Sequence, residues 1–174
     1  MKSKSKWILT VFILSFILSI IFSGISTAMT KNFHTLILIL VILLVISIGI
    51  LFDMIGVAVL TCKESNLHAK AAKKMKGAKQ AITLIKNSTK VSSVCNDVIG
   101  DICGIVSGSL GAALTLDIVG AINISLVVIT MIVTATISSL TVGFKALFKD
   151  IAEKNSDAIV YTCGKILLIF NREK

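Results

Sequence analysis

Four long apolar runs constrain the fold of this sequence more than any other feature. They extend over about residues 7–28, 35–60, 98–116 and 118–144, and the second is interrupted only by Asp53. A membrane-spanning helix needs about 20 mostly apolar residues to cross a hydrocarbon core about 30 Å thick. In addition, 55% of the 174 residues are hydrophobic and 16% are charged, which leaves too little polar surface for a soluble domain. The sequence therefore predicts an all-α integral membrane protein with about four transmembrane helices.

The distribution of basic residues predicts the orientation of these helices. Three lysines precede the first run, eight lie between the second and third, six basic residues follow the fourth, and Lys31 alone falls between the first and second. Because cytoplasmic loops collect Lys and Arg, we expect a multi-pass plasma-membrane protein with both termini in the cytoplasm. The net charge of +9 then reflects topology and attraction to the anionic headgroups of the lipid bilayer. We do not expect nucleic acid as a partner.

The first run has two interpretations. A lysine-rich start followed by an apolar stretch, with small residues at Ser26 and Ala28, is typical of a signal peptide cleaved after Ala28. However, the apolar stretch is long for a signal peptide, and another membrane segment follows almost at once. We therefore expect residues 1–30 to be a retained N-terminal membrane helix and residues 31–174 to form the main transmembrane domain.

Two segments of mixed character lie outside the runs. Residues 63–90 contain no proline and are dense in Ala, Lys and Leu, which favours a helix. Apolar residues recur there at helical spacing with lysines on the remaining surface, so we expect one basic juxtamembrane helix at the headgroup level; a solvated connector is the alternative. The stretch "DAIVYTCGKILLIF" at 157–170 is too short for a fifth span and predicts a C-terminal interfacial helix.

Cysteine and histidine residues give no sign of a catalytic or metal centre. His34 and His68 lie on opposite sides of the membrane in the expected topology, and no CxxC pair occurs. We also find no nucleophile and base pair and no phosphate-loop pattern, so we do not expect an enzyme. Four cysteines are expected to be reduced thiols that act as small apolar residues: Cys62, Cys95, Cys103 and Cys163.

Glycines repeat every four residues in the third run. Gly100, Gly104 and Gly108 form two overlapping GxxxG motifs, and Gly111 continues the stripe about one turn later. Small residues let another helix approach closely, which is a main source of helix association in lipid. The stripe therefore predicts a packing face, and we expect a homodimer formed through it or through the final helices.

Three acids and an asparagine occur where the sequence predicts membrane. Asp53 lies in the cytoplasmic half of the second run, whereas Asn96, Asp97 and Asp101 lie at the cytoplasmic start of the third. Asp97 and Asp101 are four residues apart, so we expect both to project from one helix face and to point into the bundle. Ionisable residues inside a membrane cost about 2.5–3.5 kcal/mol each on insertion scales and are candidates for an ion path.

With no basic residue expected at the same depth, protons or a cation must neutralise these acids. Oxygen ligands suit Mg²⁺, which takes carboxylates while keeping several waters, and nearby hydroxyl side chains could complete the shell. We therefore treat Asp53, Asn96, Asp97 and Asp101 as candidate metal ligands, with Mg²⁺ as the bound or transported ion and no other cofactor. In the alternative interpretation, Asn96 and Asp97 cap the helix that begins the third run.

The order of elements and three motifs resemble the transmembrane domain of the cyclin M/CorC magnesium transporters. "LFDMIGVAVLTCKE" at 51–64 is similar to the family's Phe-Ser-Gly-x-Glu-x-Ala-Leu stretch, and "VCNDVIGDI" at 94–102 to its Gly-Asn-Asn-x-x-Asn stretch. "TVGFKALFKDIAEKNSDAIV" at 141–160 is similar to its Gly-Glu-x-x-Pro-Lys-x-x-Ala stretch. The resemblance covers about residues 36–170.

The resemblance implies roles for individual positions. Asp53 falls on the serine of the family's first motif, Asn96 and Asp97 fall on its paired asparagines, and Gly100 or Asp101 meets the later asparagine. The glutamate and proline of the last motif have no counterpart here, and the chain leaves no room for the cytosolic CBS pair of the family. We therefore expect a stand-alone, divergent relative.

Two functions are compatible with these features. The first is a divalent-cation transporter or transport-related membrane protein that uses the acids and Asn96 as its polar core. The second is a non-transporting membrane scaffold or accessory protein in which the acids only cap and position helices. The distinction depends on whether Asp53 faces Asp97 and Asp101 in the bundle.

Overall fold

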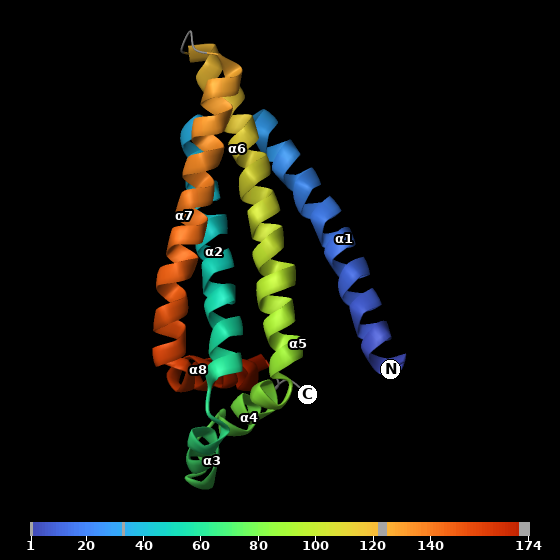
Figure 1. Cartoon of the computed structure of the whole chain (residues 1–174), viewed down its shortest axis with the longest axis vertical. Helices are drawn as coiled ribbons and strands as arrows, with labels where there is room; N and C mark the ends of the chain where they lie inside the picture. Colours follow the sequence, from blue (N-terminus) through green and yellow to red (C-terminus); the bar gives the residue numbers. More distant parts are fainter. Residues whose placement is uncertain (1, 33, 122–124, 171–174) are drawn as a thin grey trace. The chain divides into compact units, whose positions relative to one another are not determined.

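The computed structural model describes residues 2–32, 34–121 and 125–170, and within these ranges it contains helices and no strand (Figure 1). Segments long and apolar enough to cross a membrane occur four times in the described chain, at Lys6–Ser26, Thr35–Thr61, Ser88–Gly120 and Leu126–Lys154. The predicted class, an all-α protein with about four membrane-spanning helices, is confirmed.

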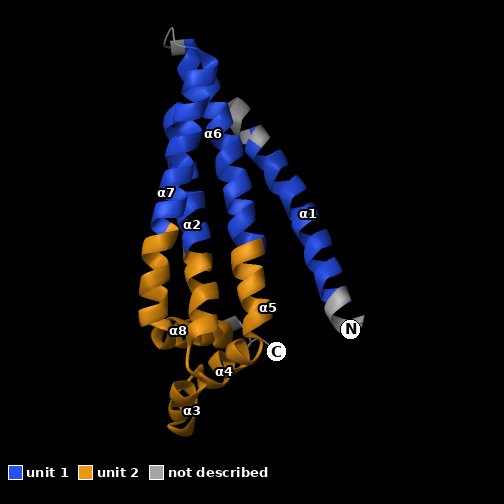
Figure 2. Cartoon of the chain, viewed as in Figure 1, with its two compact units in different colours: residues 1–50, 98–144 blue, residues 51–97, 145–174 orange. Residues whose placement is uncertain are grey.

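Short connections join the helices, and the chain divides into two compact units. Unit 1 comprises residues 1–50 and 98–144, and unit 2 comprises residues 51–97 and 145–174 (Figure 2). Each unit is therefore built from two separate stretches of chain. In chain order the elements are α1 (Lys2–Asn32), α2 (Thr35–Thr61), α3 (Glu64–Ala72), α4 (Ala78–Lys86), α5 (Ser88–Ser93), the π-helical segment η1 (Val94–Gly100), α6 (Asp101–Ala121), α7 (Leu126–Lys154) and α8 (Ser156–Phe170).

The last two spans are longer than their apolar runs. α6 continues past the predicted end of the third run to Ala121, so the acid between the runs, Asp117, is helical; it is exposed and accepts a hydrogen bond from the Thr35 Oγ1 at 3.2 Å. α7 continues past Phe144 through a charged stretch to Lys154. Lys, Glu and Ala are good helix formers, so the helix does not end where the hydropathy falls.

Unit 1 buries one stripe of each of two helices. In α2 every fourth residue from Leu38 to Ile50 is buried, and in α6 every fourth residue from Ile102 to Leu114. α1 packs against α6. Large apolar side chains such as Phe12 and Met131 stay exposed, at 71% and 66%, and apolar surface this extensive suits lipid rather than water.

The glycine stripe divides into two kinds of position. A Cβ added at Gly104 or Gly108 would meet no atom of the described chain within 4 Å, whereas one at Gly111 would overlap the Cδ1 of Ile137 on α7. The predicted packing face is therefore used within the chain at Gly111. Gly104 and Gly108 instead line an open hollow beside three hydroxyl-bearing residues of α7, Thr134, Ser138 and Thr141.

We expect these positions to respond differently to bulk. Gly111→Leu should destabilise the detergent-solubilised protein by about 1–3 kcal/mol, because Ile137 already fills the space. Gly104→Leu and Gly108→Leu should leave the melting temperature close to that of the wild type. If the open glycines form a homodimer contact, light scattering will show those two variants as monomers. Equal losses of melting temperature at all three positions would contradict this division.

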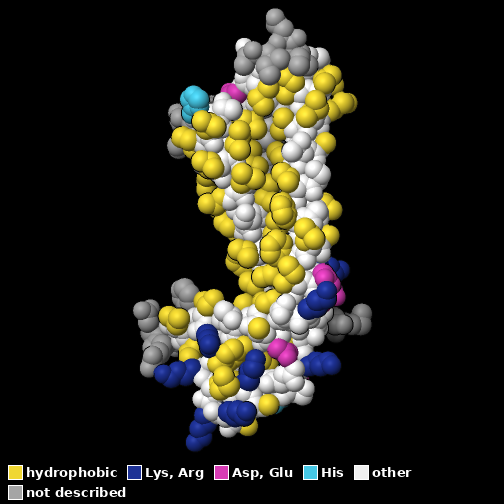
Figure 3. Space-filling view, turned by 90° about the vertical axis from the view of Figure 1, so that its left-hand side faces the viewer, with side chains coloured by type: hydrophobic (Ala, Val, Ile, Leu, Met, Phe, Trp, Pro, Cys, Tyr) yellow, Lys and Arg dark blue, Asp and Glu magenta, His cyan; other side chains and the backbone are white. Residues whose placement is uncertain are grey.

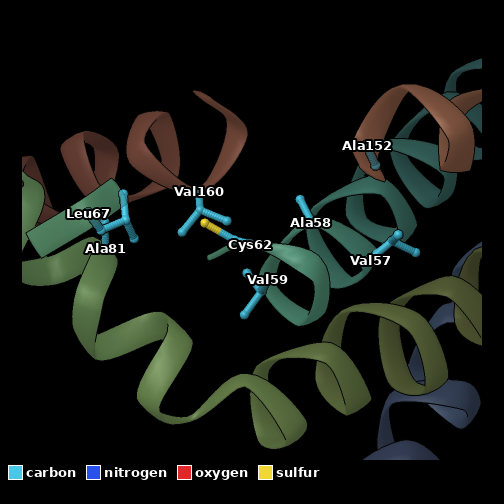
Figure 4. Close-up of a cluster of buried hydrophobic side chains, with 8 residues drawn as sticks. All are labelled: Val57, Ala58, Val59, Cys62, Leu67, Ala81, Ala152 and Val160. Carbon is cyan, nitrogen blue, oxygen red and sulfur yellow. The ribbon is translucent and has the colours of Figure 1, made fainter. Parts of the chain in front are cut away.

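Unit 2 has its own apolar core (Figure 4). The buried cluster draws side chains from the end of α2, from the short helices α3 and α4, and from α7 and α8. α3 and α4 both pack against α8, so the predicted C-terminal helix is present and docked within this unit. Members of the cluster are Val57, Ala58, Val59, Cys62, Leu67, Ala81, Ala152 and Val160.

The single helix predicted over residues 63–90 is wrong, because the chain breaks it into α3, α4 and α5. Lys74 and Gly77 adopt φ values of 54° and 87°, in the left-handed region that ends a helix and favours glycine. The turn lets Leu67 and Ala81 enter the unit 2 core, both 0% exposed. Burial against α8 therefore outweighs the helical propensity of the intervening lysines. On the face shown in Figure 3, hydrophobic side chains cover the long helices, and lysines gather around the short helices.

Candidate functional site

Asp53 lies on α2 and is paired with a lysine. Its Oδ1 is 3.5 Å from the Nζ of Lys145 on α7, and the two side chains are 18% and 28% exposed, respectively. An opposite charge at this distance offsets part of the cost of a poorly hydrated carboxylate. The expectation that no basic residue lies at the depth of Asp53 is therefore wrong. The hydropathy pattern missed Lys145 because the fourth run ends at Phe144 whereas α7 does not.

Asn96 has the most unusual surroundings of the four predicted ligands. Its Nδ2 donates a hydrogen bond to the Ser92 Oγ at 3.3 Å, but its Oδ1 is buried without a hydrogen-bond partner among the described residues. The oxygen lies against Gly56 of α2, where the Cβ of any other residue would overlap it. A buried polar atom left unpaired costs about 1–3 kcal/mol. This oxygen is therefore the atom of the predicted site with the greatest need for a ligand.

Asp97 and Asp101 are both exposed, so the expectation that they point into the bundle is wrong. Asp97, in unit 2, accepts a hydrogen bond from the Ser93 Oγ at 2.7 Å. Asp101 is the first residue of α6 and belongs to unit 1. The structure thus collects Asp53, Asn96 and Asp97 in one unit and places Asp101 in the other.

The backbone around Asn96 departs from α-helical geometry. Residues Val94–Gly100 form a π-helical turn, in which hydrogen bonds join residues five apart instead of four. Such turns occur frequently at functional sites. The capping interpretation is also wrong, since one helical span runs from Ser88 to Gly120 and neither Asn96 nor Asp97 begins it.

The chemistry of these groups fits a hard cation only with help from neutral ligands. Among the described residues, no group of three or more His, Cys, Asp or Glu side chains is placed to hold a metal ion. A cation beside the Asn96 amide oxygen would therefore depend on water for many of its ligands. Mg²⁺ accepts such a set, because it binds few protein oxygens and keeps several waters.

A polar cluster that the sequence did not indicate connects α2, α3 and α8. Asp157 accepts hydrogen bonds from the Cys62 Sγ at 3.1 Å and from the Asn66 Nδ2, and its backbone oxygen is 3.5 Å from the Lys70 Nζ. Burial raises the pKa of Asp157, but these hydrogen bonds and the Lys70 charge outweigh it and hold the pKa below its ordinary value.

The same cluster shows what Cys62 does. Burial, together with the Asp157 carboxylate, raises the pKa of the Cys62 thiol to about 12. The thiol therefore stays protonated and donates its hydrogen bond, whereas a reactive cysteine needs a lowered pKa. Cys62, Cys95 and Cys163 carry free thiols, as predicted. The cluster links the start of α8 to α3 and to the end of α2 by hydrogen bonds. Its thiol is not a nucleophile.

Comparison with known proteins adds no relative to this description. No protein-family model, no curated protein and no solved structure matches the chain. The resemblance to the cyclin M/CorC transporters stays a prediction from three motifs.

Proposed function

We propose that the protein binds a hard divalent cation such as Mg²⁺ beside Asn96 and takes part in its transport across the membrane, as the resemblance to the cyclin M/CorC family implies. The observation that carries the proposal is the buried, unpartnered Oδ1 of Asn96, in a π-helical turn packed against a glycine. Asp97 is adjacent in the chain, and Asp53 lies one helical turn before Gly56 on α2. These two acids are the carboxylates that the proposal adds to the Asn96 oxygen as ligands.

Lys145 has a defined role in this proposal. Without a divalent ion its ammonium group neutralises Asp53, and an arriving cation replaces it as the partner of that carboxylate. The exchange keeps Asp53 compensated in both states, which lowers the cost of releasing the ion into water.

The orientation is part of the proposal and rests on the distribution of lysines. Both termini and the short helices of unit 2 lie in the cytoplasm, and the α1–α2 connection lies outside the plasma membrane. In a variant whose native cysteines are replaced, Lys76→Cys should react with an impermeant thiol reagent only from the inside, and Lys31→Cys only from the outside. Labelling of position 76 from outside would refute the four-span orientation.

Metal-dependent unfolding tests the cation site. Millimolar Mg²⁺ should raise the melting temperature of the wild type in detergent, and Asn96→Ala and Asp97→Asn should abolish the shift. Asp150→Asn is the matched control, because it removes an exposed acid that pairs with Lys154 outside the site. Lys145→Gln should enlarge the Mg²⁺ shift, since Asp53 then lacks its competing partner. Mg²⁺ flux into proteoliposomes should fall in Asn96→Ala and Asp97→Asn and should be unchanged in Asp150→Asn.

A membrane scaffold is the second candidate, and one observation favours it. Asp53 and Asp97 each have a partner within the chain, Lys145 and Ser93, so neither requires a cation. In a scaffold, Lys145→Gln would lower stability whether or not Mg²⁺ is present. If Mg²⁺ does not change the melting temperature of the wild type, the protein is a scaffold and not a cation transporter.

A further inference from the structure

An open pocket lies at the turn between α3 and α4, away from the proposed cation site. It measures ≈ 420 Å³ and is bordered by α3, by the turn, by the first residues of α4 and by α8. Three lysines line it: Lys74, Lys76 and Lys79. All three are exposed and none forms an ion pair with a carboxylate of the described residues. The pocket therefore carries three uncompensated positive charges.

The surroundings add to this positive potential. Residues 63–90 contain eight lysines and one acid, Glu64, and that acid contacts His68 at 3.1 Å. The first turn of α4, which begins at Ala78, adds the partial positive charge of a helix N-terminus. An anion with more than one negative charge, such as a phosphate monoester, matches this site better than a singly charged phosphodiester.

Apart from Gln80, the side chains that line the rest of the pocket are apolar, and this favours a lipid over a soluble phosphate. Met75 and Leu168 line it together with the lysines. Leu168 belongs to α8, whose neighbouring side chains Ile166 and Ile169 are 50% and 70% exposed. Exposed apolar residues beside a basic cluster are the features by which a helix contacts a membrane surface. The volume also exceeds what a bare phosphate ion would fill.

We propose that this pocket binds the phosphate-monoester headgroup of an anionic phospholipid, with the phosphate held by Lys74, Lys76 and Lys79 and the glycerol end of the lipid against Met75 and Leu168. The site is independent of the cation site, because it shares no residue with it. Lipid binding in this pocket would attach the short helices of unit 2 to membranes that contain phospholipids with a phosphate-monoester headgroup.

Lipid-dependent unfolding of the full chain in detergent tests the proposal. Dioctanoyl phosphatidic acid should raise the melting temperature of the wild type by several degrees, dioctanoyl phosphatidylglycerol clearly less, and dioctanoyl phosphatidylcholine or inorganic phosphate not at all. The triple variant Lys74→Gln, Lys76→Gln, Lys79→Gln should lose the phosphatidic acid shift. Arginines at the same three positions should retain it, which separates loss of charge from loss of fold.

The matched control removes three lysines of the same segment outside the pocket. Lys63→Gln, Lys73→Gln, Lys86→Gln changes the net charge equally at exposed positions and should keep the full shift. Equal losses in the two triple variants would show diffuse attraction to anionic lipid and overturn the pocket. An equal response to inorganic phosphate would overturn the lipid assignment, and an equal response to phosphatidylglycerol would overturn the preference for a monoester.

Discussion

Gly164→Ala is expected to destabilise the protein by about 1–3 kcal/mol, although it adds a single methyl group. In an ordinary helix position, alanine is about 1 kcal/mol more favourable than glycine. At Gly164 the added Cβ would lie 2.5 Å from the backbone oxygen of Gly77 and 2.8 Å from the Cβ of Ala81. Neither neighbour is the end of a flexible side chain, so α8 must move away from α4. A lower melting temperature in detergent is the measurement.

Gly143→Ala provides the control for this result. Gly143 lies inside α7, and a Cβ there would meet no atom of the described chain within 4 Å. The substitution should leave the melting temperature unchanged or raise it. If Gly164→Ala proves as stable as Gly143→Ala, the close approach of α8 and α4 does not exist in solution.

Leu67→Ala is expected to cost about 2–5 kcal/mol, the range for large-to-small changes in a well-packed core. Leu67 is 0% exposed and belongs to the apolar cluster of unit 2 with Ala81 and Val160. The cavity cannot close easily, because the neighbours lie on helices that Gly77 and Gly164 hold at close range. Thermal unfolding should show the loss, and limited proteolysis should cut the α3–α4 segment faster.

Leu147→Ala is the comparison for Leu67→Ala. Leu147 lies on α7 and is 63% exposed, so its truncation leaves no internal cavity. Its effect on stability should be within about 0.5 kcal/mol, as for other surface positions. Similar losses at positions 67 and 147 would show that α3 is not packed into a core.

Hydropathy was enough to predict the four spans, because a helix that crosses lipid must be apolar along its length. The short helices were harder to predict. The many lysines and alanines of residues 63–90 favour helix, and the break depends also on contacts with α8, about 80 residues later in the chain. Local propensity carries no information about that partner.

The candidate site shows the same limit. Sequence spacing identified Asp53 and Asn96 as polar residues in membrane segments, but it could not show that Lys145 compensates the first or that Gly56 lies against the second. Lys145 is about 90 residues from Asp53 in the sequence, and Gly56 has no side chain whose chemistry could indicate the contact. The expectation that Asp97 and Asp101 point into the bundle failed for a different reason, since their spacing indicates a shared helix face but not whether that face is buried, and both residues are exposed.

Unit 2 is built from two stretches of chain that are far apart in the sequence, and this affects how it assembles during synthesis. α4 ends at Lys86 and α8 ends at Phe170, so the ribosome needs roughly 4–17 seconds between them at about 5–20 residues per second. Throughout that interval Leu67 and Ala81 have no α8 to contact. Until α8 has been synthesised, the apolar side chains of α3 and α4 therefore lack the partner against which they are buried in the folded protein.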